Sequence, residues 1–274
     1  MMRALYSGIT GLRNHQTRMD VIGNNISNVN TAGYKASRVV FQDIYSQTLS
    51  PASAATTGTK GGTNPRQVGL GSTIASIDVI QTSSASQYTG VPFDLSIEGS
   101  GFFAIQSNGQ TLYTRTGNLG TDNLNQLVTG SGALVLGYMG ATPAGGPTVM
   151  TIDPKYKDVS IDENGAITGI DSTSASSDKV TIGYIAIATF NNENALEKVG
   201  QNAYRATTNS GAATYSTPGK GVAGKLNPGT LEMSNVDLAS EFTDMIVTQR
   251  GFQANSRIIT TTDSMLEELV NLKR

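Results

Sequence analysis

The segment from residue 234 to residue 274 constrains the fold more than any other stretch, because apolar side chains recur in it every seven residues. They are Leu238, Met245, Phe252, Ile259 and Leu266. A seven-residue recurrence keeps side chains on one face of a slightly under-wound helix, as in a coiled coil. The companion column is apolar only at its ends, at Phe242 and Val270. The segment therefore predicts a long helix with one apolar and one mixed column, although an ordinary amphipathic surface helix is the alternative.

The N-terminal segment, residues 3–29, shows the same arrangement. Its apolar column is Leu5, Leu12, Met19 and Ile26. The second column is again mixed, since it includes Gln16 and Gly23. Two segments with the same column structure at opposite ends of a chain predict that the terminal helices pair as a coiled coil or assemble with other copies. An independent core helix at each end would leave the shared pattern unexplained.

A cluster of asparagines closes the N-terminal helix. Its members, with the glycine that follows them, are Asn24, Asn25, Asn28, Asn30 and Gly33. Asparagine side chains compete for backbone hydrogen bonds and glycine accepts a positive φ, so this pattern is typical of a helix end followed by a turn. A polar binding site is the second interpretation of the same residues.

Between the two ends, the hydrophobic period changes from helical to two. Residues 46–66 are small, polar and rich in glycine, which predicts a linker or a long exposed loop. Residues 67–229 alternate apolar and polar side chains and predict an all-β domain, in which Asn108-Gly109 suits the type I′ turn of a hairpin. The irregular stretch 141–178 is expected to be a small insertion in that domain or a small hairpin.

The predicted fold class is therefore α+β. Helical segments at residues 1–45 and 230–274 pair as a coiled coil, and the central all-β domain lies between them in the sequence.

Composition argues against several kinds of function. The net charge is −2 and charged residues make up 15% of the chain, so no basic field invites nucleic acid. The sequence contains one histidine, His15, and no cysteine, which removes the parts of most metal sites and nucleophilic triads. We expect no cofactor, no metal site and no enzymatic activity. We also expect no cleavable signal peptide and no membrane insertion.

Three long blocks of sequence resemble one known family. LYSGITGLRNHQTRMDVIGNNISNVNTAGYKASRVVFQD (residues 5–43) is similar to the N-terminal signature of the bacterial flagellar rod and hook proteins. GVPFDLSIEGSGFFAI (residues 90–105) resembles the opening of their first β domain. EMSNVDLASEFTDMIVTQRGFQANSRIITTTDSMLEELVNL (residues 232–272) is similar to their C-terminal signature. Three blocks in the right order are far more specific than one short motif.

The resemblance implies a structural subunit in which the terminal helices line a hollow tube and the β domain lies outside. GGTNPRQVGLGS (residues 61–72) is most similar to hook proteins. The expected function is therefore a subunit of the flagellar hook, a bendable helical tube that transmits motor torque to the filament. A distal rod subunit of the basal body is the alternative. Larger hook proteins carry an outer β domain, for which residues 141–178 leave too little chain.

The resemblance also implies partners and a location. The partners are further copies of the chain, the distal rod, the hook cap, the hook–filament junction proteins and the flagellar export apparatus. The location is extracellular, in the hook or basal body, reached by export without a cleavable signal peptide. A third class of function, an adhesin-like binding module formed by the β domain alone, would leave the matched terminal patterns unexplained.

Overall fold

The computed structural model describes residues 2–54, 61–140, 145–172 and 179–272. The chain has the α+β class, and it divides into two compact units. The helical unit comprises Met1–Ser27, Ser37–Val79 and Asp237–Arg274. The β unit comprises Asn28–Ala36 and Ile80–Val236. Each unit is thus assembled from separate pieces of sequence.

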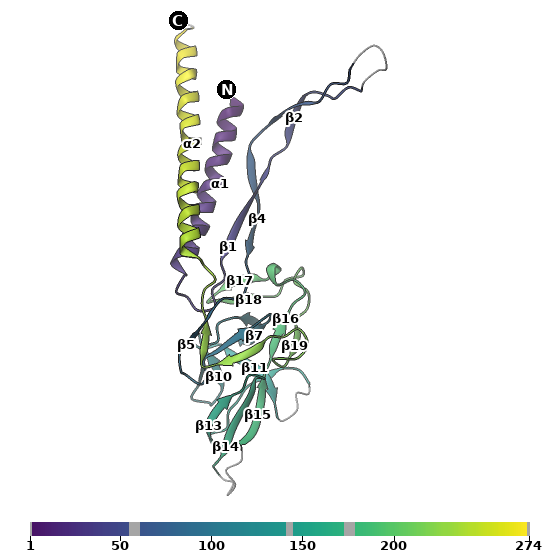
Figure 1. Ribbon diagram of the computed structural model, residues 1–274, viewed down its shortest axis with the longest axis vertical. Coiled ribbons are helices and arrows are strands. Elements are labelled where there is room, and N and C mark those ends of the chain that lie inside the picture. The colour runs from purple at the N-terminus through teal and green to yellow at the C-terminus, as the bar shows by residue number, and fades with distance from the viewer. Residues whose placement is uncertain (1, 55–60, 141–144, 173–178, 273–274) are drawn as a thin grey trace. The chain divides into compact units, whose positions relative to one another are not determined.

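The helical unit is built on two antiparallel helices that lie side by side (Figure 1). They are α1, Met2–Ser27, and α2, Leu238–Asn271. Asp237 caps α2, since its Oδ1 accepts a hydrogen bond of 2.9 Å from the amide of Ala239. The periodic patterns therefore placed both helices correctly, within a few residues at each end.

Two strand pairs accompany the helices in the helical unit. Strand β1 (Ser37–Asp43) pairs with β4 (Ser72–Val79), and β2 (Ser46–Ser50) pairs with β3 (Arg66–Gly69), all antiparallel. The prediction of a linker or long exposed loop at 46–66 is wrong for Ser46–Ser50 and Arg66, which belong to β2 and β3, although nearly all described side chains of the range are exposed as expected. Small polar side chains do not prevent pairing here, because backbone hydrogen bonds join β2 to β3 and Gln67 Nε2 donates a further bond of 3.1 Å to Thr48 Oγ1. Residues 55–60 of the predicted linker lie outside the described residues.

These strands also correct two predicted domain boundaries. The first segment is helical only to Ser27, because residues 37–43 alternate half-buried and exposed side chains and pair with β4. The β unit begins at Ile80 rather than at residue 67, apart from the piece Asn28–Ala36. At its other end the β unit extends to Val236, so the residues just after 229 belong to a strand before α2 begins.

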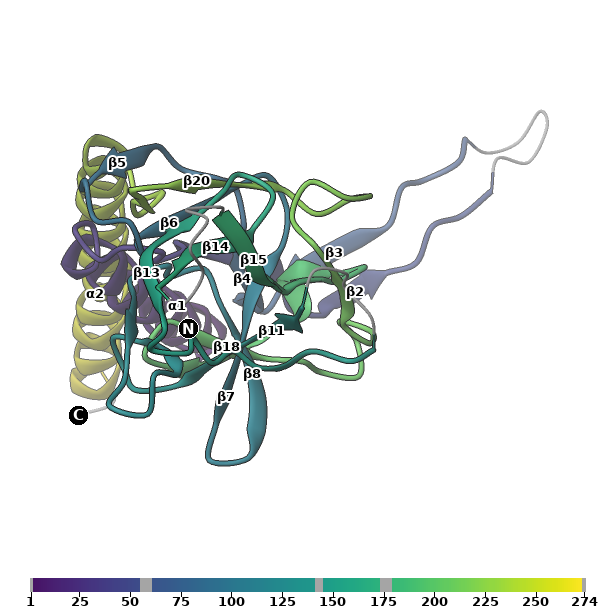
Figure 2. The same ribbon diagram turned by 90° about the horizontal axis from the view of Figure 1, so that it is seen from below.

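The β unit is dominated by one antiparallel sheet, whose main path is β13-β14-β15-β11-β7-β8-β18-β17. Figure 2 shows the β7–β8 hairpin projecting from it. The strands of that path are β7 (Phe102–Ser107), β8 (Gln110–Thr114), β11 (Leu134–Met139), β13 (Tyr156–Ile161), β14 (Ala166–Asp171), β15 (Lys179–Ile185), β17 (Glu197–Gly200) and β18 (Ala203–Arg205). Attached to it are β9 (Leu119–Thr121), β10 (Leu127–Thr129), β12 (Thr148–Val149), β16 (Ile187–Thr189) and β19 (Thr214–Ser216).

Two smaller ladders and a short helix complete the β unit. The ladders are β5 (Ser86–Tyr88) with β21 (Thr230–Glu232), and β6 (Leu95–Glu98) with β20 (Lys225–Pro228). The 3-10 helix η1 spans Glu193–Ala195. In both ladders a strand from late in the chain pairs with one that precedes the main sheet.

Strand β7 explains how the sheet is buried. Phe103 and Ile105 point into one apolar cluster, while Phe102 and Ala104 point into a second. All four side chains are buried, because successive residues of a strand face opposite sides and both sides of this sheet are covered. The predicted turn after β7 is confirmed, since Asn108 and Gly109 both have positive φ, 51° and 77°.

Of the two alternatives for 141–178, the described part agrees with the small hairpin, since β13 pairs antiparallel with β14, and it does not form a separate insertion. Strands β12, β13 and β14 all join the main sheet, and β14 lies directly between β13 and β15. Alternation in this stretch is weak because register shifts interrupt both of its ladders. Residues 141–144 and 173–178 lie outside the described residues.

Candidate assembly surface

The contact between α1 and α2 is made largely by small residues. Gly8 lies against α2, where an added Cβ would come within 3.3 Å of Ile259 and 3.7 Å of the Asn255 carbonyl oxygen. A Cβ on Gly11 would lie 2.8 Å from the Asn255 amide nitrogen. The absence of side chains at these positions lets the two helices approach closely.

Polar bonds extend this contact along the helices. Arg18 forms an ion pair with Asp244 at 3.0 Å. Asn25, which is 1% exposed, donates from Nδ2 to Glu241 Oε1 at 3.0 Å. Burial raises the pKa of the Glu241 carboxyl, while the bond from Asn25 acts in the opposite direction. These contacts fix which faces of the helices meet.

The predicted seam residues are not the buried residues of this contact. In α2 the buried side chains are Thr248 and Thr262, whereas Leu238 and Phe252 remain 39% and 42% exposed. The other predicted positions are half-buried: Leu5, Leu12, Met19, Ile26, Met245, Ile259 and Leu266. The column is therefore partly covered, with Ile259 lying against Gly8 of α1, and its role in an assembly seam stays a prediction.

The uncovered surfaces of both helices are rich in large apolar side chains. On α1 the exposed ones are Met2, Tyr6 and Ile9. On α2 they are Leu238, Phe242, Ile246, Val247, Phe252, Ile258, Met265, Leu269 and Val270, with Leu272 just beyond its end. Apolar side chains in such number on a helix surface are typical of a surface that another protein covers. We call these exposed residues of α1 and α2 the apolar helix faces.

The hydrogen bonds described for the asparagine cluster join its side chains to neighbouring parts of the chain, which is a structural role. Asn25 Oδ1 accepts the amide of Ser37 at 3.0 Å, and its Nδ2 also donates to the Ser37 carbonyl at 2.9 Å. One buried side chain thereby ties the end of α1 to the start of β1. Asn24, one residue earlier, is exposed on α1.

The rest of the cluster forms the predicted turn in the β unit. The carbonyl and side-chain oxygens of Asn28 accept bonds of 3.1 Å from the amide and hydroxyl of Thr31. Asn30 is exposed in that turn. Gly33 has a φ of 69°, and an added Cβ would lie 2.9 Å from the backbone nitrogen of Thr116. Only glycine fits this position without strain.

A buried charge cluster, which sequence reasoning missed, fixes the segment that follows the turn. Lys35 Nζ lies 2.6 Å from Glu232 Oε1 and donates to the Thr82 carbonyl at 2.7 Å. Arg115 approaches Glu232 Oε2 at 3.4 Å and donates to the Gly99 carbonyl at 2.8 Å. Lys35, Glu232 and Arg115 are at most 2% exposed. The only signal in the sequence was that each of the three lies in or near a family block.

Burial shifts the pKa values of Lys35 and of neighbouring Glu193. Desolvation lowers the pKa of Lys35, although Glu232 acts to raise it. Half-buried Glu193 has a pKa raised by burial, which the fields of Arg115 and Lys35 partly oppose. Two cations and one carboxylate thus share a dry site, where the loss of the carboxylate would leave buried positive charge uncompensated.

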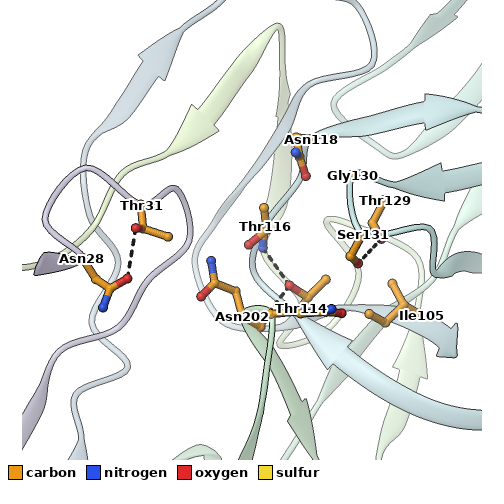
Figure 3. Close-up of a pocket in the computed structure, with 11 residues that line it drawn as sticks. Asn28, Thr31, Ile105, Thr114, Thr116, Asn118, Thr129, Gly130, Ser131 and Asn202 are labelled. Atoms are coloured by element: carbon orange, nitrogen blue, oxygen red, sulfur yellow. Dashed lines mark hydrogen bonds between the residues drawn. The ribbon is translucent and has the colours of Figure 1, made fainter. Parts of the chain in front are cut away.

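A polar cavity of about 470 Å³ opens beside the turn (Figure 3). Its lining consists of hydroxyl and amide side chains with one aliphatic residue and no charged group. They include Asn28, Thr31, Ile105, Thr114, Thr116 and Asn202. Most of these polar groups already bond to one another or to backbone, as the bond from Thr114 Oγ1 to the Asn202 carbonyl at 2.9 Å illustrates. The cavity contains none of the titratable pairs that acid–base catalysis uses.

Two features are absent from the described parts of the chain. No group of three or more histidine, cysteine, aspartate or glutamate residues is placed to hold a metal ion. None of the described helices is long and apolar enough to cross a membrane.

Comparison with family models matches three regions of the chain. Residues 5–35 match "Flagella basal body rod protein", residues 96–169 match "Flagellar hook protein FlgE/F/G D1 domain", and residues 227–272 match "Flagellar basal body rod FlgEFG protein C-terminal". The first and third matches cover much of the terminal helices, and the second covers the first half of the β unit.

Whole-length relatives fall into two groups. The chain is 50% identical to the flagellar basal-body rod protein FlgG of Bacillus subtilis (strain 168) over 275 residues, with all of both chains covered. It is 36% identical to FlgG of Caulobacter vibrioides, with 99% of this chain and all of that protein covered. It is 31% identical to the flagellar hook protein FlgE of Treponema pallidum, over 467 residues and with all of both chains covered.

Paired terminal helices with uncovered apolar faces, joined to a β unit, are features of a structural subunit that assembles with other chains. The chain belongs to the flagellar rod and hook protein family. It is accordingly a component of the flagellar basal body or hook.

Proposed function

We propose that this chain is a subunit of the distal rod of the flagellar basal body. The observation that carries the proposal is the 50% identity to a rod protein over an alignment of 275 residues, nearly the length of the chain itself. The hook relative aligns over 467 residues, so it contains long segments with no counterpart here. These alignments favour the rod over the expected hook.

The apolar helix faces supply the driving force for polymerisation. Each copy exposes side chains such as Ile246, Val247 and Met265. Fully burying one such side chain stabilises the assembly by roughly 1.5–3 kcal/mol. Neighbouring copies cover these faces and complete the coiled-coil packing of the terminal helices. Because the contact joins different surfaces of successive copies, it does not close and the polymer grows as a helical tube.

A hook subunit is the second candidate. It is supported by relatives named as hook proteins that are 31% identical over their whole length. The rod and hook candidates share the helix-lined tube and differ in its mechanical property. A rod subunit forms a straight, rigid tube, whereas a hook subunit forms one that bends.

Location and further partners follow from the same proposal. The subunit passes through the flagellar export apparatus and assembles outside the cytoplasm. In the rod, its neighbours are further copies of the chain and, at the far end, the hook. In the hook, the neighbours are the distal rod, the hook cap and the hook–filament junction proteins.

Electron microscopy of concentrated, purified protein tests this function, with flagellar rod–hook fragments added as seeds. The expected product is a straight hollow tube that extends the seeds. Curved tubes would transfer the assignment to the hook. A chain that stays monomeric and never extends the seeds would contradict both candidates, and binding of carbohydrate by that monomer would favour the adhesin-like alternative.

A further inference from the structure

His15 lies where three elements of the helical unit meet, and it is the only histidine in the sequence. It projects from α1. Its ring centroid is 6.2 Å from that of Phe41 in β1, with an edge-to-face angle of 66°. On α2, a Cβ added to Gly251 would lie 2.6 Å from His15 Cε1 and 2.7 Å from Nε2. The missing side chain at Gly251 therefore makes the space in which the imidazole packs.

One ring nitrogen of His15 has no hydrogen-bond partner. Nδ1 is buried, and no acceptor or donor within the described residues reaches it. A neutral imidazole carries a proton on one nitrogen only, whereas the imidazolium carries one on each. Protonation must therefore leave a buried N–H at Nδ1 without an acceptor, which disfavours the charged form at this position.

The charged group that acts on His15 is a cation. Arg18 lies one turn further along α1, and its guanidinium is 6.0 Å from the centre of the Phe41 ring. Asp244 of α2 is already paired with Arg18 at 3.0 Å. Burial lowers the pKa of His15, and the field of Arg18 lowers it further.

The remaining charged groups on the adjoining elements are engaged elsewhere or exposed. On α2, Arg250 beside Gly251 is exposed and donates to Gln253 at 3.2 Å. On β1, Arg38 pairs with Asp78 of β4 at 3.7 Å, and Asp43 is exposed at the end of the strand. None of them bonds to the imidazole.

We propose that His15 is an acid-sensitive joint, which holds α1, α2 and β1 together when neutral and weakens their packing when protonated. The direction of this pH dependence follows from linkage. A chain whose α1 and α2 are separated binds the proton at His15 more readily than a chain whose helices are packed. Stability of the helix pair is therefore complete above the ordinary histidine pKa of about 6.5 and falls as the pH decreases toward the pKa of the packed ring. The inference concerns the helix pair and does not rest on the rod assignment.

The test uses the full-length chain without a polyhistidine tag, both in solution and as sedimented polymer. Because His15 is the only histidine, its Cε1–H resonance gives its titration without ambiguity. Hydrogen exchange followed by mass spectrometry gives the protection of α1 and α2 from pH 8 to pH 5, after correction for intrinsic exchange. The first variant is H15Q, which removes the titration. The second is the double variant H15Q/Q16H, which moves the histidine to the exposed neighbouring position.

The expected result is a His15 pKa below about 6.5 in any sample whose helices are protected. Protection of α1 and α2 in the wild type should fall by up to about tenfold per pH unit below that value, and it should not fall in either variant. An ordinary pKa in a sample with protected helices would overturn the proposal. The same loss of protection in H15Q would do so too, as would a chain whose helices show no protection in either state at pH 7.5.

Discussion

The two units of this protein bury opposite kinds of side chain. In the β unit the interior is apolar, with Phe102, Phe103 and Ile185 among many side chains that are fully buried. In the described residues of the helical unit, Ile22 is the one buried hydrophobic side chain, and the other buried positions are Gly8, Asn14, Asn25, Thr248 and Thr262. The large apolar side chains of the helices lie outside. The difference supports the proposal that the β unit forms its core within one chain, whereas the helical unit needs other chains to cover its apolar helix faces.

The largest expected effect concerns the free chain. We expect α1 and α2 to be largely disordered before assembly, because their apolar faces are uncovered and paired helices alone barely offset the entropy of ordering them. Their amides should exchange with solvent several orders of magnitude faster than those of β7 and β11, which report the stability of a domain core. Hydrogen exchange on the monomer gives both rates. Equal protection of the amides in the two units would contradict the expected difference between them.

The substitution Phe252→Asp addresses the apolar helix faces directly. It places a carboxylate on a surface that assembly must bury, so we expect no tubes while the unfolding free energy of the β unit changes by less than about 0.5 kcal/mol. Sedimentation and electron microscopy measure assembly. Ser264→Asp is the matched control, since Ser264 is exposed on the same helix and bonds only to the Thr260 carbonyl. Normal tubes from Phe252→Asp would show that this face is not an interface.

Within the β unit, Glu232→Ala should have the next largest effect. It leaves Lys35 and Arg115 buried without their carboxylate, which typically costs about 3–5 kcal/mol. Urea unfolding followed by tyrosine fluorescence measures this loss, because the chain has ten tyrosines and no tryptophan. Glu197→Ala is the control: its partner Arg205 lies 2.7 Å away on the surface, and such a pair contributes about 1 kcal/mol or less. Similar losses for both variants would contradict the role assigned to the buried cluster.

The smallest expected effect distinguishes two helical glycines. Gly23→Ala has open space around it, so it should stabilise α1 by about 0.5–1 kcal/mol through helix propensity. In Gly251→Ala the added methyl group would press against the His15 ring, and this overpacking should destabilise the helix pair by about 1–3 kcal/mol. The higher helix propensity of alanine offsets part of that loss. Hydrogen exchange in the assembled state measures both effects, on α1 for Gly23→Ala and on both helices for Gly251→Ala. A gain in both variants would show that close helix approach is unimportant.

Sequence patterns predicted the elements of the β unit better than their arrangement. Alternation and the Asn108-Gly109 turn indicated the β7–β8 hairpin, because both signals are local. The boundary at Ile80 was not predictable in the same way, since β1 ends at Asp43 and β4 begins only at Ser72, and the residues between them carry no clear pattern. The buried bond between Lys35 and Glu232 was not predicted for a similar reason, because a single Lys and a single Glu far apart in the sequence form no periodic pattern.

The terminal helices show a different limit of sequence reasoning. Seven-residue recurrence located both helices, and the asparagine cluster with Gly33 located the turn that follows Asn28. Recurrence alone did not indicate which column would face the partner helix. That choice depends on Gly8, Gly11 and Gly251, whose missing side chains allow close approach, and a count of apolar residues passes over them.

The bond between Lys35 and Glu232 joins residues 197 positions apart, and this spacing sets an order of events in time. A chain that emerges with its N-terminus first exposes Lys35 early, but the carboxylate that neutralises it arrives only when most of the chain has followed. Until then Lys35 has reason to stay in water, and the strand that carries Glu232 has not yet paired with β5. The β unit therefore cannot complete its folding while only part of the chain is present. A subunit that enters a passage too narrow for folded protein would then still be unfolded.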